Sequence, residues 1–280
     1  MKRNMNEWLK TILNDKRKKA FPILSFPAAQ LMGISVRELI SDSGKQAQGM
    51  KLIAQRNAAY GANSLMDLSV EAECFGAEIF FSDNEIPTVK GCLVSSYEQA
   101  EALKIPEIGC GRTGIYTDAI KKAADYITDR PVFGCVIGPF SLSGRLLSVT
   151  EAMIMCYEQP DTVHLLLEKA SEFIIKYILA FKAAGANGVA LAEPLAGMLS
   201  PSLSKEFSCA YVKKIIEAVQ DENFIVIYHN CGNSTVYMID NILEVNASAY
   251  HFGNAIKMSD MLPHIPADKI VMGNIDPAGQ

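Results

Sequence analysis

The chain of 280 residues has no apolar run that approaches the ~20 residues needed for a membrane-spanning helix. Its first stretch, Met1 to Leu13, is polar and lacks the apolar core of a secretion signal. A basic excess is also missing, because the net charge is −5 and the pI is near 5.5. The one cationic cluster, Lys16 to Lys19, is typical of a solvated helix end. We therefore expect a cytoplasmic protein that binds neither nucleic acid nor membranes.

A disulfide framework is absent as well. The seven cysteines are an odd number at irregular spacing, namely Cys74, Cys92, Cys110, Cys135, Cys156, Cys209 and Cys231. This pattern is typical of free thiols in a reducing compartment, most of them acting as small buried apolar residues.

Short apolar runs alternate with amphipathic helical stretches along most of the chain. We predict strands at Pro22–Phe26, Leu65–Ser69, Val132–Gly138, Gly188–Glu193, Phe224–His229, Ala249–Phe252 and Lys269–Asn274. Their continuous apolar character is typical of parallel strands that are covered on both faces. The longest predicted helix starts just after Pro160 and ends at Gly185, and another spans about Ser202 to Val219. The stretch Glu78–Val89, which contains Pro87, is predicted to be a hairpin or an excursion from the sheet.

This alternation indicates either a doubly wound sheet or a (β/α)8 TIM barrel. Gly109, Gly111 and Gly114 have the offsets of a Gly-x-Gly-x-x-Gly nucleotide-binding motif, but no predicted strand precedes them. They are typical of a loop before a helix, which weakens the case for a Rossmann domain. A (β/α)8 barrel needs one more strand and helix than the seven strands predicted here. Either the barrel is incomplete in this sequence, or the apolar pattern does not reveal one of its strands.

In a (β/α)8 barrel the active site lies at the carboxyl ends of the strands. Polar residues follow most of the predicted strand ends, namely Ser141, Glu193, His229, Cys231, His251, Asn254, Asn274 and Asp276. His229 and Cys231 are the most informative, because residues two apart on a strand point to the same face. An imidazole and a thiol together suit zinc. A catalytic zinc site has three protein ligands, so a third must come from elsewhere.

These candidates also have structural interpretations. His229 and Cys231 can equally be a buried histidine and an inert thiol. His251 can be a core histidine bonded to the backbone. Glu193, which precedes a proline, can cap a neighbouring loop, and Asp276 before a proline is a common start of a turn.

Five segments carry a family resemblance across nearly the whole chain, namely Asp67–Glu73, Gly138–Leu146, Glu193–Gly197, His229–Asn233 and Met272–Pro277. Of these, the His-x-Cys-Gly element at His229 is the most specific. With these segments the chain resembles the uroporphyrinogen decarboxylase superfamily, and within it the branch of cobalamin-dependent methyltransferases. This branch includes the methylcobalamin:coenzyme M methyltransferases.

The resemblance implies a distorted (β/α)8 TIM barrel, here a single domain over residues 1–280 without its last strand–helix unit. It implies that His229 and Cys231 bind zinc together with a later cysteine near the end of the last strand. No cysteine follows Cys231, so we expect the natural chain to continue past Gln280.

The activity implied by the resemblance is methyl transfer, assisted by zinc, between a corrinoid and a thiol or similar small-molecule acceptor. The corrinoid, methylcobalamin, would be carried by a partner corrinoid protein. Zinc would stabilise the acceptor as a thiolate, which attacks the methyl group on cobalt. Glu193 and His251 are the catalytic candidates beside the zinc or the acceptor. Asn274 and Asp276 are the candidates for cofactor binding.

Two other functions remain open. The first is a metal-free lyase that acts on a tetrapyrrole, because Phe81-Ser82-Asp83 resembles the segment that supplies the catalytic aspartate of the decarboxylases. Asp83 can equally lie in a solvated turn. Against the lyase, residues 23–30 lack the arginines with which decarboxylases bind substrate carboxylates. The second is a non-catalytic corrinoid-binding protein whose zinc site has decayed.

Overall fold

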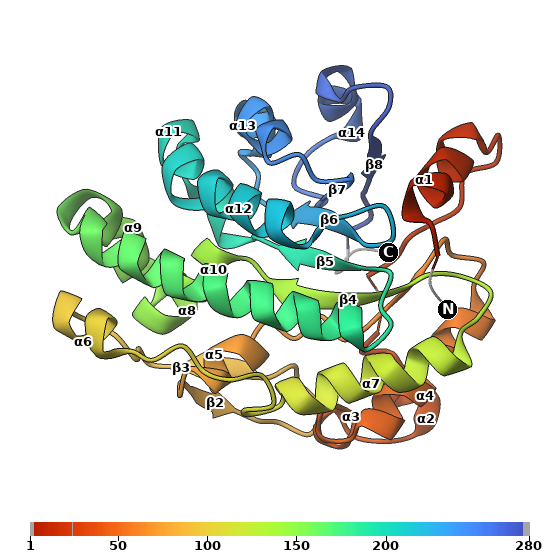
Figure 1. The fold of residues 1–280 in the computed structure, drawn as a ribbon, viewed down its shortest axis with the longest axis horizontal. Coiled ribbons are helices and arrows are strands. Elements are labelled where there is room, and N and C mark those ends of the chain that lie inside the picture. Colours follow the sequence, from red (N-terminus) through yellow and green to blue (C-terminus); the bar gives the residue numbers. More distant parts are fainter. Residues whose placement is uncertain (1–2, 24, 277–280) are drawn as a thin grey trace.

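The computed structural model describes residues 3–23 and 25–276 and has an α/β fold (Figure 1). Its main sheet consists of the parallel strands β1 Ala62–Asn63, β4 Val132–Ile137, β5 Gly188–Ala192, β6 Ile225–Asn230, β7 Ala249–Phe252 and β8 Ile270–Met272. Their order in the sheet is β1-β4-β5-β6-β7-β8. Within the described residues β1 pairs only with β4 and β8 only with β7, so the sheet is a half-barrel with two open edges.

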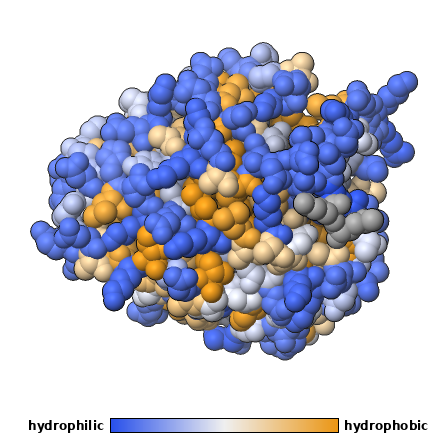
Figure 2. All heavy atoms as spheres, viewed as in Figure 1, coloured by the Kyte–Doolittle hydropathy of each residue, from blue (hydrophilic) through white to orange (hydrophobic). Residues whose placement is uncertain are grey.

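Helices connect the strands, and most of them cover the outside of the sheet. They are α1 Met5–Asn14, α2 Ala28–Met32, α3 Val36–Ser41, α4 Ser43–Arg56, α5 Val70–Cys74, α6 Tyr97–Ala102, α7 Thr113–Tyr126, α8 Pro139–Leu147, α9 Val149–Glu158, α10 Pro160–Ala183, α11 Pro201–Ser204, α12 Ala210–Val219, α13 Ile239–Glu244 and α14 Met258–Met261. The helix α1 packs instead on the inner face of the sheet. Figure 1 shows α7, α10 and α12 in front of the sheet, and α7 and α10 contact β4. Hydrophilic side chains cover most of this helical face (Figure 2).

Each strand buries its two faces in different cores. On β6, Val226 and Tyr228 pack under the outer helices, whereas Ile225 and Ile227 pack on the inner face with residues of α1. This alternation follows from the two-residue period of a strand. His229 continues the inner series, so its imidazole lies inside the half-barrel.

Two predicted strands are wrong. Residues 22, 23, 25 and 26 are not in a strand, although this segment runs beside β1. Side chains join them there, because Asn63 Nδ2 donates to the Pro22 carbonyl (3.0 Å) and Ser25 Oγ to the Ser64 carbonyl (2.8 Å). Leu65–Ser69 bends instead of pairing, because Asp67 Oδ1 accepts the N–H of Ser69 (3.1 Å).

The other elements agree with the sequence pattern. The predicted hairpin exists as the antiparallel strands β2 Glu78–Phe80 and β3 Thr88–Lys90. The long helix is α10, and Gly185 just beyond it has a φ of 100°, which favours glycine. In the part of the chain that the structure describes, no helix is both long and apolar enough to span a membrane.

Candidate functional site

A pair of histidines lies where β6 and β7 end on the inner face. The ladder places His229 directly opposite His251. The Nδ1 atom of His229 lies 3.1 Å from the carbonyl oxygen of His251 and 2.8 Å from its Nδ1. Because a carbonyl only accepts, His229 Nδ1 must carry the proton, and it can share this proton with His251 Nδ1. The hydrogen bonds therefore assign His229 the tautomer whose Nε2 has a free lone pair, which is the form that binds a metal.

Burial keeps both rings neutral. It lowers the pKa of His229, although the hydrogen bond to the His251 carbonyl opposes this shift. Burial, together with the neighbouring His229, lowers the pKa of His251 to about 4. Both histidines are thus uncharged near neutral pH, and a neutral imidazole is the form that a metal ion requires.

Glycines bring Cys231 and its turn close to the neighbouring segments. A Cβ on Gly253 would lie 2.5 Å from Cys231 Cβ, so only glycine fits beside this cysteine. A Cβ on Gly232 would lie 2.4 Å from Gly197 Cα. The turn after β6 therefore packs backbone to backbone against the turn after β5, which explains the glycines in two of the segments that carry the family resemblance.

Gly232→Ala should consequently destabilise the protein by about 1–3 kcal/mol, because backbone atoms cannot move aside as a flexible side chain can. The free energy of unfolding from urea titration measures this loss. Gly114→Ala is the matched control, because the nearest atom to its added Cβ would be at an ordinary 3.5 Å. An equal loss for both variants would contradict the close packing of the two turns.

Glu193 lies at the end of β5 but faces the helices. Its carboxylate accepts the N–H of Phe140 (2.8 Å), the N–H of Ser141 (2.9 Å) and the hydroxyl of Ser141 (2.6 Å) at the start of α8. Burial raises the pKa of Glu193 to about 7, although these hydrogen bonds act to lower it. The capping interpretation of Glu193 is thus what the structure shows. Its backbone N–H donates to the His229 carbonyl (2.8 Å), which links it to the histidine pair through the main chain.

The remaining predicted site residues divide into two places. Asn274 follows β8 and donates to the carbonyls of Gly253 (2.7 Å) and Ile256 (2.8 Å), so it braces the loop after β7. Asp276 follows it and is exposed. Asp83 lies between β2 and β3, where it accepts a hydrogen bond from the exposed Arg37 (2.9 Å), so its contacts are with α3 and not with the histidine pair.

His229, His251 and Cys231 are the residues with zinc-type donors at this end of the sheet. The donor types fit, since an imidazole with a free Nε2 and a thiol two residues on are typical zinc ligands. Among residues 3–23 and 25–276, however, no three histidine, cysteine, aspartate or glutamate side chains are arranged to hold a metal ion. His229 and Cys231 thus offer two donor types that suit zinc, and the described residues do not complete a site of three ligands.

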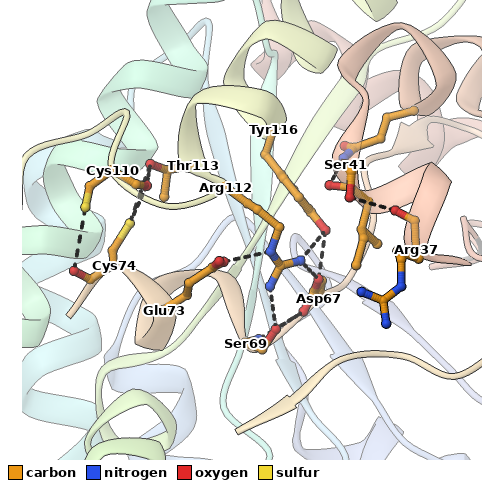
Figure 3. A network of polar contacts seen from close by, with 12 residues as sticks. Arg37, Ser41, Asp67, Ser69, Glu73, Cys74, Cys110, Arg112, Thr113 and Tyr116 are labelled. Atoms are coloured by element: carbon orange, nitrogen blue, oxygen red, sulfur yellow. Dashed lines mark hydrogen bonds and ion pairs between the residues drawn. The ribbon is translucent and has the colours of Figure 1, made fainter. Parts of the chain in front are cut away.

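A second polar cluster lies beyond the end of β1 and was not anticipated from the sequence (Figure 3). The buried guanidinium of Arg112 donates to Asp67 Oδ2, to Glu73 Oε2 (2.7 Å) and to Ser69 Oγ (2.8 Å). Tyr116 also donates to Asp67 Oδ2 (2.8 Å). We call this group the Arg112 clasp. It joins the segment after β1 to the start of α7. The signal in the sequence that could have revealed it is the presence of three acidic residues, Asp67, Glu71 and Glu73, within an apolar stretch.

Glu71 lies within the same segment and is fully buried. One oxygen accepts the N–H of Ile137 at the end of β4 (2.9 Å), while Oε2 is buried without a hydrogen-bond partner in the described part of the chain. Burial raises the pKa of Glu71 to about 7. The half-barrel therefore contains two buried glutamates, one behind the end of β4 and one behind the end of β5.

Comparison with known proteins agrees with the family resemblance. The sequence model of the family described as "Uroporphyrinogen decarboxylase (URO-D)" matches residues 19–279. The methylcobamide:CoM methyltransferase MtbA of Methanosarcina acetivorans is 27% identical over 218 residues, which cover 75% of this chain and 62% of that protein. The uroporphyrinogen decarboxylase of Pseudomonas syringae pv. tomato is 25% identical over 223 residues, with the same coverage of 75% and 62%.

A solved methyltransferase from Methanosarcina mazei has a similar fold. Its TM-score is 0.87 at 20% identity, over 99% of this chain and 84% of that one. This likeness confirms the predicted barrel-type α/β fold. The chain spans 62% of the length of the curated relatives it matches, which is less than two thirds.

Proposed function

Since the chain belongs to the uroporphyrinogen decarboxylase family, we propose that it is a methyltransferase of the corrinoid-dependent kind. Similarity to the MtbA methyltransferases supports this proposal. The observation that carries it is His229 on the inner face of the half-barrel, whose free Nε2 is assigned by its hydrogen bonds, with the thiol of Cys231 two residues further along in the turn after β6. We also propose that residues 1–280 belong to a single barrel domain.

In this proposal His229 and Cys231 are two of the ligands that hold zinc. When bound, zinc would act as a Lewis acid that keeps an acceptor thiol in its thiolate form near neutral pH. His251 orients the His229 ring through the hydrogen bond to its carbonyl. Glu193 fixes the carboxyl end of β5 against α8, and Asn274 fixes the loop after β7. His251, Glu193 and Asn274 are therefore positioning residues at the carboxyl ends of the strands.

The proposed substrates are a methylated corrinoid, carried by a partner corrinoid protein, and a small thiol or a similar acceptor. The acceptor thiolate forms a bond to the methyl carbon while the bond between carbon and cobalt breaks, and both electrons of that bond remain on cobalt.

Zinc analysis of protein expressed from the full natural reading frame tests the proposal. We expect about one zinc per chain in the parent, as a single catalytic site requires, and a loss of zinc in His229→Ala. His264→Ala is the control, because this exposed histidine lies far from β6 in the sequence and should leave the zinc content unchanged. A parent protein without zinc would contradict the proposal and favour a metal-free, decarboxylase-like function.

A further inference from the structure

Two cysteines from distant parts of the chain face each other beside the Arg112 clasp (Figure 3). The thiol of Cys74, at the end of α5, donates to the carbonyl of Cys110 (2.7 Å). In return, the thiol of Cys110 lies 3.9 Å from the carbonyl of Cys74. Each sulfur therefore lies against the backbone of the other residue. Cys74 is buried, whereas Cys110 is exposed to solvent.

The loop around Cys110 is shaped for this close approach. Gly109 and Gly111 have φ angles of 107° and 53°, which other residues adopt at a cost. A Cβ on Gly111 would lie 3.3 Å from Glu73 and 3.5 Å from the Cys74 sulfur, so the loop rests directly on α5. The glycines on both sides also let Cys110 rotate toward Cys74, as a disulfide with its narrow range of geometries requires.

We propose that Cys74 and Cys110 form a reversible disulfide, with a low-molecular-weight disulfide such as oxidised glutathione as the oxidant. The same two segments are already joined by the ion pair between Arg112 and Glu73. The disulfide adds a covalent link to this ion pair. It closes a loop of residues 75–109, which contains the β2–β3 hairpin and α6.

The reaction takes place in two steps. The exposed Cys110 thiolate attacks one sulfur of oxidised glutathione, which forms a mixed disulfide and releases one glutathione thiolate. Cys74 then loses its proton and attacks the Cys110 sulfur, which forms the protein disulfide and releases the second glutathione. Two protein thiols are oxidised and one glutathione disulfide is reduced, so electrons and atoms balance.

The second step is slow at neutral pH, because burial raises the pKa of Cys74 to about 12 and only the thiolate reacts. The mixed disulfide on Cys110 therefore accumulates first. Its conversion should accelerate roughly tenfold for each pH unit between pH 7 and 9, in proportion to the thiolate fraction of Cys74. Reduction of the protein by excess glutathione reverses both steps.

The test is to incubate the full chain with oxidised glutathione and to map its peptides by mass spectrometry without reduction. We expect a linked pair of peptides containing Cys74 and Cys110, with the loss of two hydrogen atoms. The midpoint of thermal unfolding should rise by roughly 5–10 °C, because the closed loop restricts the unfolded chain. Added dithiothreitol should reverse both changes.

Three variants separate the proposal from general thiol oxidation. Cys110→Ser should form no linked pair and show no rise in the midpoint, and Cys74→Ser should retain a stable mixed disulfide on Cys110. Cys92→Ser, which removes another exposed cysteine, should behave like the parent. A parent in which Cys110 stays unmodified, keeps glutathione at pH 9, or pairs with a cysteine other than Cys74 would overturn the proposal.

Discussion

Arg112→Ala is expected to lower the free energy of unfolding by about 3–5 kcal/mol, the loss typical of breaking a buried ion pair. Asp67 has no exposed side-chain area, and among the described residues the substitution leaves its carboxylate with the hydroxyls of Ser69 and Tyr116 and the N–H of Ser69 as hydrogen-bond donors. A buried carboxylate without a counter-charge is strongly unfavourable. Urea unfolding at pH 7, followed by circular dichroism, measures the loss as a lower midpoint at an unchanged slope.

Arg37→Ala is a close control for this prediction. Arg37 also pairs with an aspartate, Asp83, and also lies over the ring of Phe81. Its side chain is 52% exposed, however, compared with 7% for Arg112. Exposed ion pairs contribute less than about 1 kcal/mol, so this variant should be close to the parent. Equal losses in the two variants would show that burial does not control the energy of the Arg112 clasp.

Glu71 should contribute a loss of stability as the pH rises from 5 to 8. The lowered pKa values of His229 and His251 act in the opposite direction in the acidic part of this range. The pKa of Glu71 in the folded protein is about 7, above the ordinary value of 4.5. In this range the folded chain holds a proton that the unfolded chain has released. The stabilisation is therefore complete below pH 4.5 and is lost as the pH rises through 7. Since one pKa unit corresponds to about 1.4 kcal/mol, the loss approaches about 3 kcal/mol.

Glu71→Gln tests this prediction, because an amide does not titrate. Between pH 5 and 8 the free energy of unfolding of the parent should fall by about 3 kcal/mol relative to that of this variant. Glu98→Gln is the control with the opposite sign. A hydrogen bond to the side chain of Ser96 lowers the pKa of Glu98, so the stabilisation that this variant lacks is constant between pH 5 and 8 and would be lost in the parent only at acidic pH. Parallel pH profiles for the parent and Glu71→Gln would refute a raised pKa at Glu71.

The sequence by itself determined the elements whose signals are local. Continuous apolar runs identified five of the six sheet strands to within two residues at each end, and apolar periodicity identified α10. Strand alternation placed His229 on the inner face of β6, whereas Cys231 lies in the turn after β6, where this alternation no longer holds. The family segments indicated the family, which the match over residues 19–279 confirms.

Only the tertiary structure decided how distant side chains pair. The partner of His229 is set by the register between β6 and β7, which no local pattern contains. Glu193 was grouped with His229 because both end strands, yet it continues the series of Val189 and Leu191 that faces the helices. The Arg112 clasp joins segments separated by about forty residues, which become neighbours only when α7 packs beside the end of β1. Burial, which sets the strength of the clasp and the pKa of Glu71, is likewise a property of the packed fold and not of the residue types.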